Sequence, residues 1–155
     1  MPELKLIALD AEDLAVISAH LQDAVMQLGD VAYLPREKRF AIIANRFDWA
    51  DALSEEGGKP VYARRRAALR FERVLGAKVQ GIDLRNKSAV LSLLTIGFEA
   101  ETEPAGLVTL LFADGGAIRL QVECIEAEMK DLGPVWQATS KPQHPDDAAS
   151  KTSDT

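Results

Sequence analysis

The chain has 155 residues with a formal net charge of −6, and 47% of its residues are hydrophobic and 27% charged. That length and composition are typical of a single globular domain and exclude a fibre, a collagen or a wholly disordered chain. The single cysteine, Cys124, cannot form a disulfide within the chain, and two histidines are too few for a histidine-based metal cage. The sequence has no signal-peptide pattern and no apolar run of membrane-spanning length, so we expect a cytoplasmic protein with no membrane partner.

The first fifty residues predict one strand, one helix and a small β-meander. An apolar run at residues 4–9 is followed by Asp10, a favourable helix N-cap, and then by larger apolar side chains at helical spacing. This pattern predicts a strand that leads into a helix over 11–22. Turn-forming residues at 29–30 and 35–38 then separate three short apolar segments. The predicted strands of this meander cover residues 24–28, 31–34 and 39–47.

Residues 51–60, DALSEEGGKP, have no apolar period, and we interpret this loop as the seam between two halves of the chain. Residues 61–82 are ambiguous, because RRRAALRFERVLG is rich in helix formers and yet also divides into two faces at period two. We favour strands for this segment. One face would then consist of Ala63, Arg65, Ala67, Leu69 and Phe71. Segments 38–47 and 65–74 resemble each other loosely, which leaves an internal duplication open.

The next part of the chain predicts further antiparallel strands. Residues 90–98 and 107–112 carry apolar side chains on both faces, as buried strands do. Asp114-Gly115-Gly116 is a typical hairpin turn, because glycine adopts the positive φ that such turns need. Residues 117–125 then alternate between apolar and polar, which predicts a half-exposed strand.

The carboxy-terminal part predicts a short helix and a disordered tail. From Ile125 to Leu132 the apolar spacing lengthens to that of a helix, and Gly133-Pro134 is a typical stop. No large apolar residue follows Trp136, so we predict one domain over 1–136 and a disordered tail over 137–155. The fold class is therefore α+β. It is mainly antiparallel β in two small meanders, with an N-terminal helix and a short C-terminal helix, and the order of elements also resembles a pleckstrin-type barrel.

The charge is unevenly distributed along the chain. Residues 36–73 hold ten Lys or Arg against six Asp or Glu, a local balance of +4, so the remaining residues carry −10. On the strand interpretation, one face of this segment carries a tyrosine and three arginines, whose planar side chains suit phosphate or carboxylate recognition. The candidate binding residues are Arg64, Arg66, Arg70 and Tyr62. The alternative is a solvated strand face whose arginines pair with neighbouring acids and protect a sheet edge.

No other pattern in the sequence predicts a catalytic residue, a cofactor or a metal ligand. Glu56-Gly57-Gly58-Lys59 lacks the flanking glycine and hydroxyl residue of a phosphate-binding loop. Cys124 shares a predicted strand face with aliphatic residues, so we expect a buried and inert thiol. Glu99, Glu101 and Glu103 alternate in FEAETEP, which we interpret as a solvated loop beside a proline and a glycine.

Two segments carry a resemblance to a known family. GIDLRNKSAVLSLLTIGFE and LFADGGAIRLQVECIEAEMKDLGPVW, with KPQHP after them, resemble an uncharacterised family of short, mostly alphaproteobacterial proteins, catalogued as a domain of unknown function. The resemblance covers nearly the whole predicted domain. It implies a bacterial, cytosolic, stand-alone domain, and it brings no catalytic motif, cofactor or substrate for any residue of this chain.

Two classes of function are open from the sequence. The leading hypothesis is a non-catalytic binding or adaptor module that recognises a small anion or an acidic protein surface through its basic strand face. The competing hypothesis is a small enzyme whose site the sequence does not identify. We do not expect nucleic-acid binding, because the net charge is negative and the basic segment lacks the interleaved aromatic residues that stack on bases.

Overall fold

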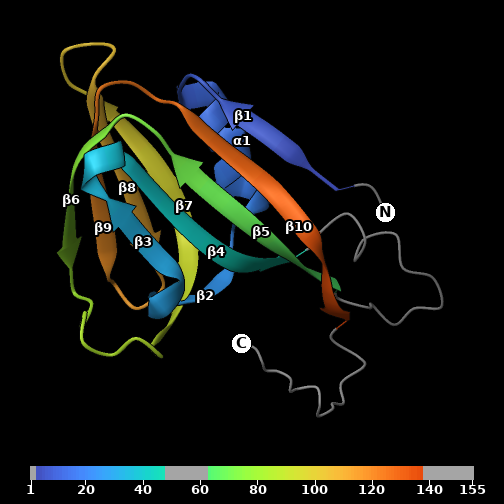
Figure 1. Cartoon of the computed structure of the whole chain (residues 1–155). Coiled ribbons are helices and arrows are strands. Elements are labelled where there is room, and N and C mark those ends of the chain that lie inside the picture. The colour runs from blue at the N-terminus through green and yellow to red at the C-terminus, as the bar shows by residue number, and fades with distance from the viewer. Residues whose placement is uncertain (1–2, 48–62, 138–155) are drawn as a thin grey trace.

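The computed structural model describes residues 3–47 and 63–137, which form a large antiparallel sheet with one α-helix and two short 3-10 helices (Figure 1). The first elements are β1 (Lys5–Ala8), α1 (Ala11–His20), β2 (Val25–Gln27), η1 (Leu28–Asp30), β3 (Val31–Leu34), η2 (Pro35–Glu37) and β4 (Arg39–Phe47). The later strands are β5 (Ala63–Phe71), β6 (Val74–Gln80), β7 (Val90–Ala100), β8 (Gly106–Phe112), β9 (Ala117–Val122) and β10 (Ala127–Gln137). The predicted seam at 51–60 and residues 138–155 of the predicted tail lie outside the described residues.

The strands are paired in the order β1-β10-β5-β4-β2-β7-β8-β9-β6, and β3 pairs with β4 beside this path. Over the described residues this is an open sheet, and the closed barrel suggested by the order of elements is wrong. β5 and β6 are consecutive in the chain but lie in different parts of the sheet, as the green strands of Figure 1 show. The chain turns between them at Arg73, whose φ is 64°.

Helix α1 begins where its N-cap predicts. The backbone N–H of Asp13 donates a hydrogen bond of 2.8 Å to the Asp10 side chain, which satisfies one of the free donors of the first turn. Leu14 and Ile17 are buried on the side of the helix that contacts β1 and β7. No helix within the described residues is long and apolar enough to cross a membrane.

The first predicted meander is wrong in its connections, although its three strands form close to their predicted positions. β2 and β3 do not pair with each other. Each pairs with β4 instead, β2 at Val25↔Asn45 and β3 at Val31↔Ile42. The three residues of η1 lie between the two pairings and shift the register. The second predicted meander is confirmed, since β7, β8 and β9 pair in sequence order and the chain turns at Gly115 with a φ of 95°.

The predicted C-terminal helix is also wrong, because the segment is strand β10, which pairs with β1 and β5. Alternate residues of β10 are buried, at Ala127, Met129 and Asp131. Because the third buried residue is polar, the sequence does not show the apolar alternation at period two that indicates a strand. Gly133-Pro134 does not end the segment. A bulge lies between Asp131 and Gly133, and β10 beyond that point pairs with β5 alone, where a proline is tolerated.

A single apolar core lies between the sheet and α1. Its largest fully buried side chains come from strands that are distant in sequence, including Phe40 of β4, Phe71 of β5 and Phe112 of β8. Leu14 and Ile17 of α1 belong to the same cluster. The outer faces of the sheet are therefore the surfaces on which a binding site can form.

Candidate functional site

The strand interpretation of the basic segment is confirmed by β5. Residues 65, 67, 69 and 71 of β5 are buried, whereas Arg66 and Arg70 are exposed and Arg64 is partly buried. The three predicted arginines therefore share the outer face of one strand. Tyr62, the fourth predicted binding residue, lies outside the described residues.

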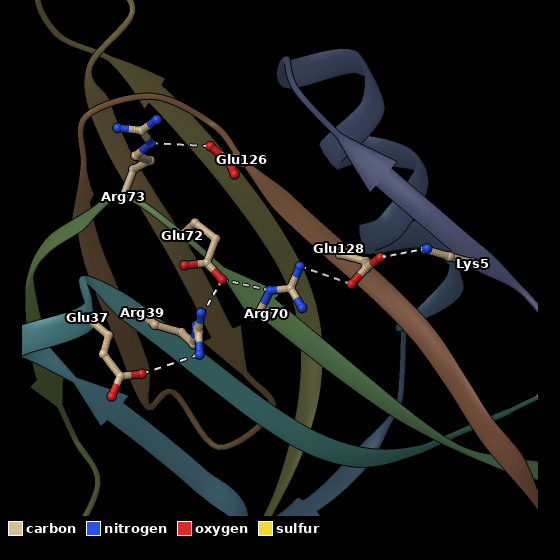
Figure 2. Close-up of polar contacts among 8 residues, drawn as sticks. All are labelled: Lys5, Glu37, Arg39, Arg70, Glu72, Arg73, Glu126 and Glu128. Carbon is tan, nitrogen blue, oxygen red and sulfur yellow. Dashed lines mark hydrogen bonds and ion pairs between the residues drawn. The ribbon is translucent and has the colours of Figure 1, made fainter.

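Arg70 is held between two carboxylates on this face (Figure 2). Its Nε lies 2.7 Å from Glu72 Oε2, and its Nη2 lies 3.0 Å from Glu128 Oε1. The side chains of Glu72 and Glu128 are only 19% and 18% exposed, so water screens these contacts less than it screens a pair at the tip of a loop. An incoming anion would have to compete with both carboxylates.

The same pairing continues across the neighbouring strands and forms two chains of ion pairs, which we call the ion-pair network. One chain runs Lys5–Glu128–Arg70–Glu72–Arg39–Glu37, and the other runs Lys38–Glu123–Arg73–Glu126. A surface hollow of about 500 Å³ lies among these residues. The network joins five cations to five carboxylates, so its formal charge is zero.

Arg64 is engaged in a different way. Its guanidinium carbon lies 4.0 Å from the centre of the Phe47 ring, a cation–π contact with the neighbouring strand β4. Its Nη1 atom is buried and has no hydrogen-bond partner among the described residues. The guanidinium group of Arg64 is therefore already engaged by the Phe47 ring.

Arg66 differs from both of its neighbours. It is exposed, and within residues 3–47 and 63–137 it has no ion-pair partner. It lies directly opposite Asn45 of β4, beside a hollow of about 350 Å³ that we call the Arg66 hollow. The hollow lies between β2 and β4. It is next to η1, where the strand pairing with β4 changes register. Its other lining residues include Val25, Gln27, Asp30, Ile43 and Val90.

The inner face of the sheet holds a buried charge cluster that sequence reasoning missed. Arg46 is 2% exposed, Arg65 6% and Asp131 1%, and all three lie at the same end of β4, β5 and β10. Arg46 holds Asp131 through two parallel hydrogen bonds of 2.9 and 2.8 Å, and the backbone N–H of Leu4 donates a third at 2.9 Å. The signal was present in the sequence, because Arg46 follows Phe40, Ile42 and Ala44 at period two.

These contacts determine the protonation of Asp131. Burial by itself would raise the pKa of this carboxyl group. The hydrogen bonds from Arg46 and Leu4, together with the charges of Arg46 and Arg65, outweigh burial and lower the pKa below its ordinary value. Asp131 is therefore a permanently charged structural anchor at neutral pH.

The structure also tests the expectation of a buried thiol at Cys124. Cys124 is only partly buried, so the expectation of a buried thiol is wrong. Strand β9 ends at Val122, and the alternation on which that expectation depended does not extend two residues beyond the strand. Among the described residues, no group of three or more His, Cys, Asp and Glu side chains could hold a metal ion.

The comparisons with known proteins identify the family but no activity. The family model "Protein of unknown function (DUF2948)" matches residues 4–144, nearly the whole chain. No curated protein and no solved structure matches the chain significantly. The chain therefore belongs to the DUF2948 family.

Proposed function

We propose that this member of the DUF2948 family is a non-catalytic, cytoplasmic binding module that takes a carboxylate group of an acidic protein surface at Arg66. The observation that carries the proposal is the difference among the three arginines of β5. Arg70 is paired with two acids and Arg64 is stacked on an aromatic ring, whereas Arg66 is exposed beside a hollow. A guanidinium group with free donors binds a carboxylate in a planar, two-point geometry.

The lining of the Arg66 hollow supports a carboxylate as the ligand. Asn45 lies opposite Arg66 in the sheet, and its amide can donate a further hydrogen bond to a carboxylate oxygen. Asp30 at the same hollow places a negative charge near the site, which disfavours a densely charged polyanion such as duplex nucleic acid.

The surroundings of the hollow support a protein partner. Val90, which lines it, is 62% exposed, and an apolar side chain beside a charged anchor is suited to a wide contact surface.

The pKa shifts of three described residues follow from their ion-pair and hydrogen-bond partners. A hydrogen bond to Glu126 raises the pKa of Arg73, and a hydrogen bond from Arg85 lowers that of Asp83. The pKa of Asp131 is also lowered, against the effect of its burial. Each of these shifts stabilises the charged form of a group that already has a partner of opposite charge.

The proposal is tested by titrating the isotope-labelled protein with a glutamate-rich peptide and following its backbone amide signals. We expect shifts that cluster at Val25, Asn45 and Arg66 and that weaken as salt is added. Arg66→Gln should abolish these shifts without changing the fold, because the exposed Arg66 side chain has no ion pair within residues 3–47 and 63–137 and the substitution keeps the backbone pairing of β5.

Arg85→Gln is the matched control for this experiment. It removes the same charge from a side chain that is 91% exposed and does not line the hollow, so the titration should be unchanged. The proposal is wrong if Arg66→Gln binds the peptide as the unaltered protein does, or if the shifts map to the ion-pair network instead.

A further inference from the structure

Two cations, Lys78 and Arg119, are paired across the antiparallel strands β6 and β9, which lie in the other part of the sheet from β5 and β10 (Figure 1). Lys78 of β6 is directly opposite Arg119 of β9 in the register of the two antiparallel strands. Side chains in that relation start from Cβ atoms about 5 Å apart on one face of the sheet, and like charges placed there destabilise the pair.

Nothing among the described residues compensates these charges as the ion-pair network compensates Arg70. Arg119 donates a hydrogen bond of 2.6 Å from Nη1 to the neutral side chain of Gln80, which leaves its other donors available. No ion pair of Lys78 or Arg119 is present within residues 3–47 and 63–137. The two strands therefore place two positive charges side by side on this face.

The two cations line a surface hollow of about 370 Å³. One side is formed by Gly76, where a side chain would meet no other atom within 4 Å, so the missing side chain keeps the space open. Leu107 of β8 supplies an apolar wall, and Gln121 of β9 lies between Gly76 and Leu107 in the sheet register. The hollow combines charge, apolar contact and a neutral amide, as small-molecule sites do.

One carboxylate also lines this hollow. Glu101 Oε1 accepts a hydrogen bond of 2.6 Å from Gln121 Nε2, which holds the carboxylate on the side of Gln121. With two cations and one acid the hollow has a formal charge of +1. Glu101 repels a bare anion, but its free lone pairs can accept a hydrogen bond from a hydroxyl group.

We propose that this hollow is a binding site for a small hydroxylated organic anion. Its phosphate or carboxylate group lies between Lys78 and Arg119, and a hydroxyl group donates to Glu101. Binding relieves the repulsion between the two cations, which is the physical reason for placing them in register. The site shares no lining residue with the Arg66 hollow, so the two proposals stand or fall separately.

The test measures the affinity of the full chain for inorganic phosphate, acetate and glycerol phosphate by calorimetry, with amide signals to locate the site. Lys78→Gln and Arg119→Gln should each weaken phosphate binding about tenfold, the loss expected for one charged hydrogen bond. Glu101→Gln should instead strengthen phosphate binding about threefold, because it removes one exposed repulsive charge. Comparison of phosphate with acetate decides which anionic group the site prefers.

Glycerol phosphate should bind the unaltered protein more tightly than inorganic phosphate does, and Glu101→Gln should remove most of that preference. Arg85→Gln is the control with the same loss of charge, and its phosphate affinity should not change. Without an anion, Lys78→Gln should melt at the same temperature as the unaltered protein or higher, which separates lost binding from lost folding. The inference is overturned if phosphate perturbs no amide in β6 or β9, or if Lys78→Gln and Arg119→Gln retain full affinity.

Discussion

Asp131 is the residue on which the buried end of the sheet depends. Arg46 is almost fully buried, and the two-point contact with Asp131 neutralises its charge there. Removal of one partner from such a pair leaves a buried charge uncompensated, which is far more costly than the net gain from forming the pair.

We predict that Asp131→Asn lowers the free energy of unfolding by about 3–5 kcal/mol, the range for a broken buried pair. Chemical denaturation of the two proteins measures the difference. Asp83→Asn is the matched control, because Asp83 and its partner Arg85 are exposed and this change should have little effect. A loss as small as that of the control would show that water reaches the Arg46–Asp131 pair.

The same residue predicts how stability responds to acid. Because the folded-state pKa of Asp131 is lowered, its stabilising contribution is complete above its ordinary pKa of 3.8. That contribution decreases as the pH falls below this value, and it is lost once the pH has fallen through the lower folded-state pKa. The stability difference between the unaltered protein and Asp131→Asn should therefore be constant near neutral pH and shrink in acid. A difference that is unchanged in strong acid would contradict the assigned direction of the shift.

At the scale of elements, a buried hydroxyl group of helix α1 joins the helix to β7. The backbone N–H of Ile96 donates a hydrogen bond of 2.9 Å to Ser18 Oγ, beyond the point where β2 stops pairing with β7. The helix thus satisfies a buried donor that has no strand partner at this edge.

We predict that Ser18→Ala lowers the free energy of unfolding by about 1–3 kcal/mol, because it leaves the Ile96 N–H buried without an acceptor. Thermal or chemical unfolding measures the change. Ser88→Ala, at an exposed position in the loop before β7, should leave stability nearly unchanged. Equal effects of the two substitutions would indicate that the hydrogen bond to the helix contributes nothing.

At the scale of the whole molecule, one core joins the strands of the two predicted halves. Phe40 and Phe71 belong to one part of the sheet and Phe112 to the other, and all three are in the same buried cluster with Leu14 of α1. Small domains with one core unfold in a single cooperative transition.

Phe112→Ala is therefore expected to destabilise the entire molecule, by about 3–5 kcal/mol, the usual cost of removing a buried aromatic ring. Circular dichroism in the far and near ultraviolet should give coincident unfolding curves before and after the substitution. If the protein instead unfolds in two transitions and Phe112→Ala shifts only one of them, the halves fold independently and the predicted single domain is wrong.

The sequence alone determined the elements whose signals are local. Asp10 and the apolar stripe after it predicted α1, because a cap and a helical face are formed by residues within a few positions of one another. Strands β5 and β9 followed from alternation at period two, which also placed Arg66 and Arg70 on the outer face. Strand β4 followed from an apolar segment after turn-forming residues.

Only the tertiary structure decided which of the predicted binding residues are available. Glu128, which neutralises part of the charge of Arg70, lies on β10, a segment whose spacing indicated a helix. The opposition of Lys78 and Arg119 likewise depends on the register of β6 against β9. Capping and periodicity are properties of neighbouring residues, whereas ion pairing, strand partners and buried charge arise between segments that meet only when the sheet forms.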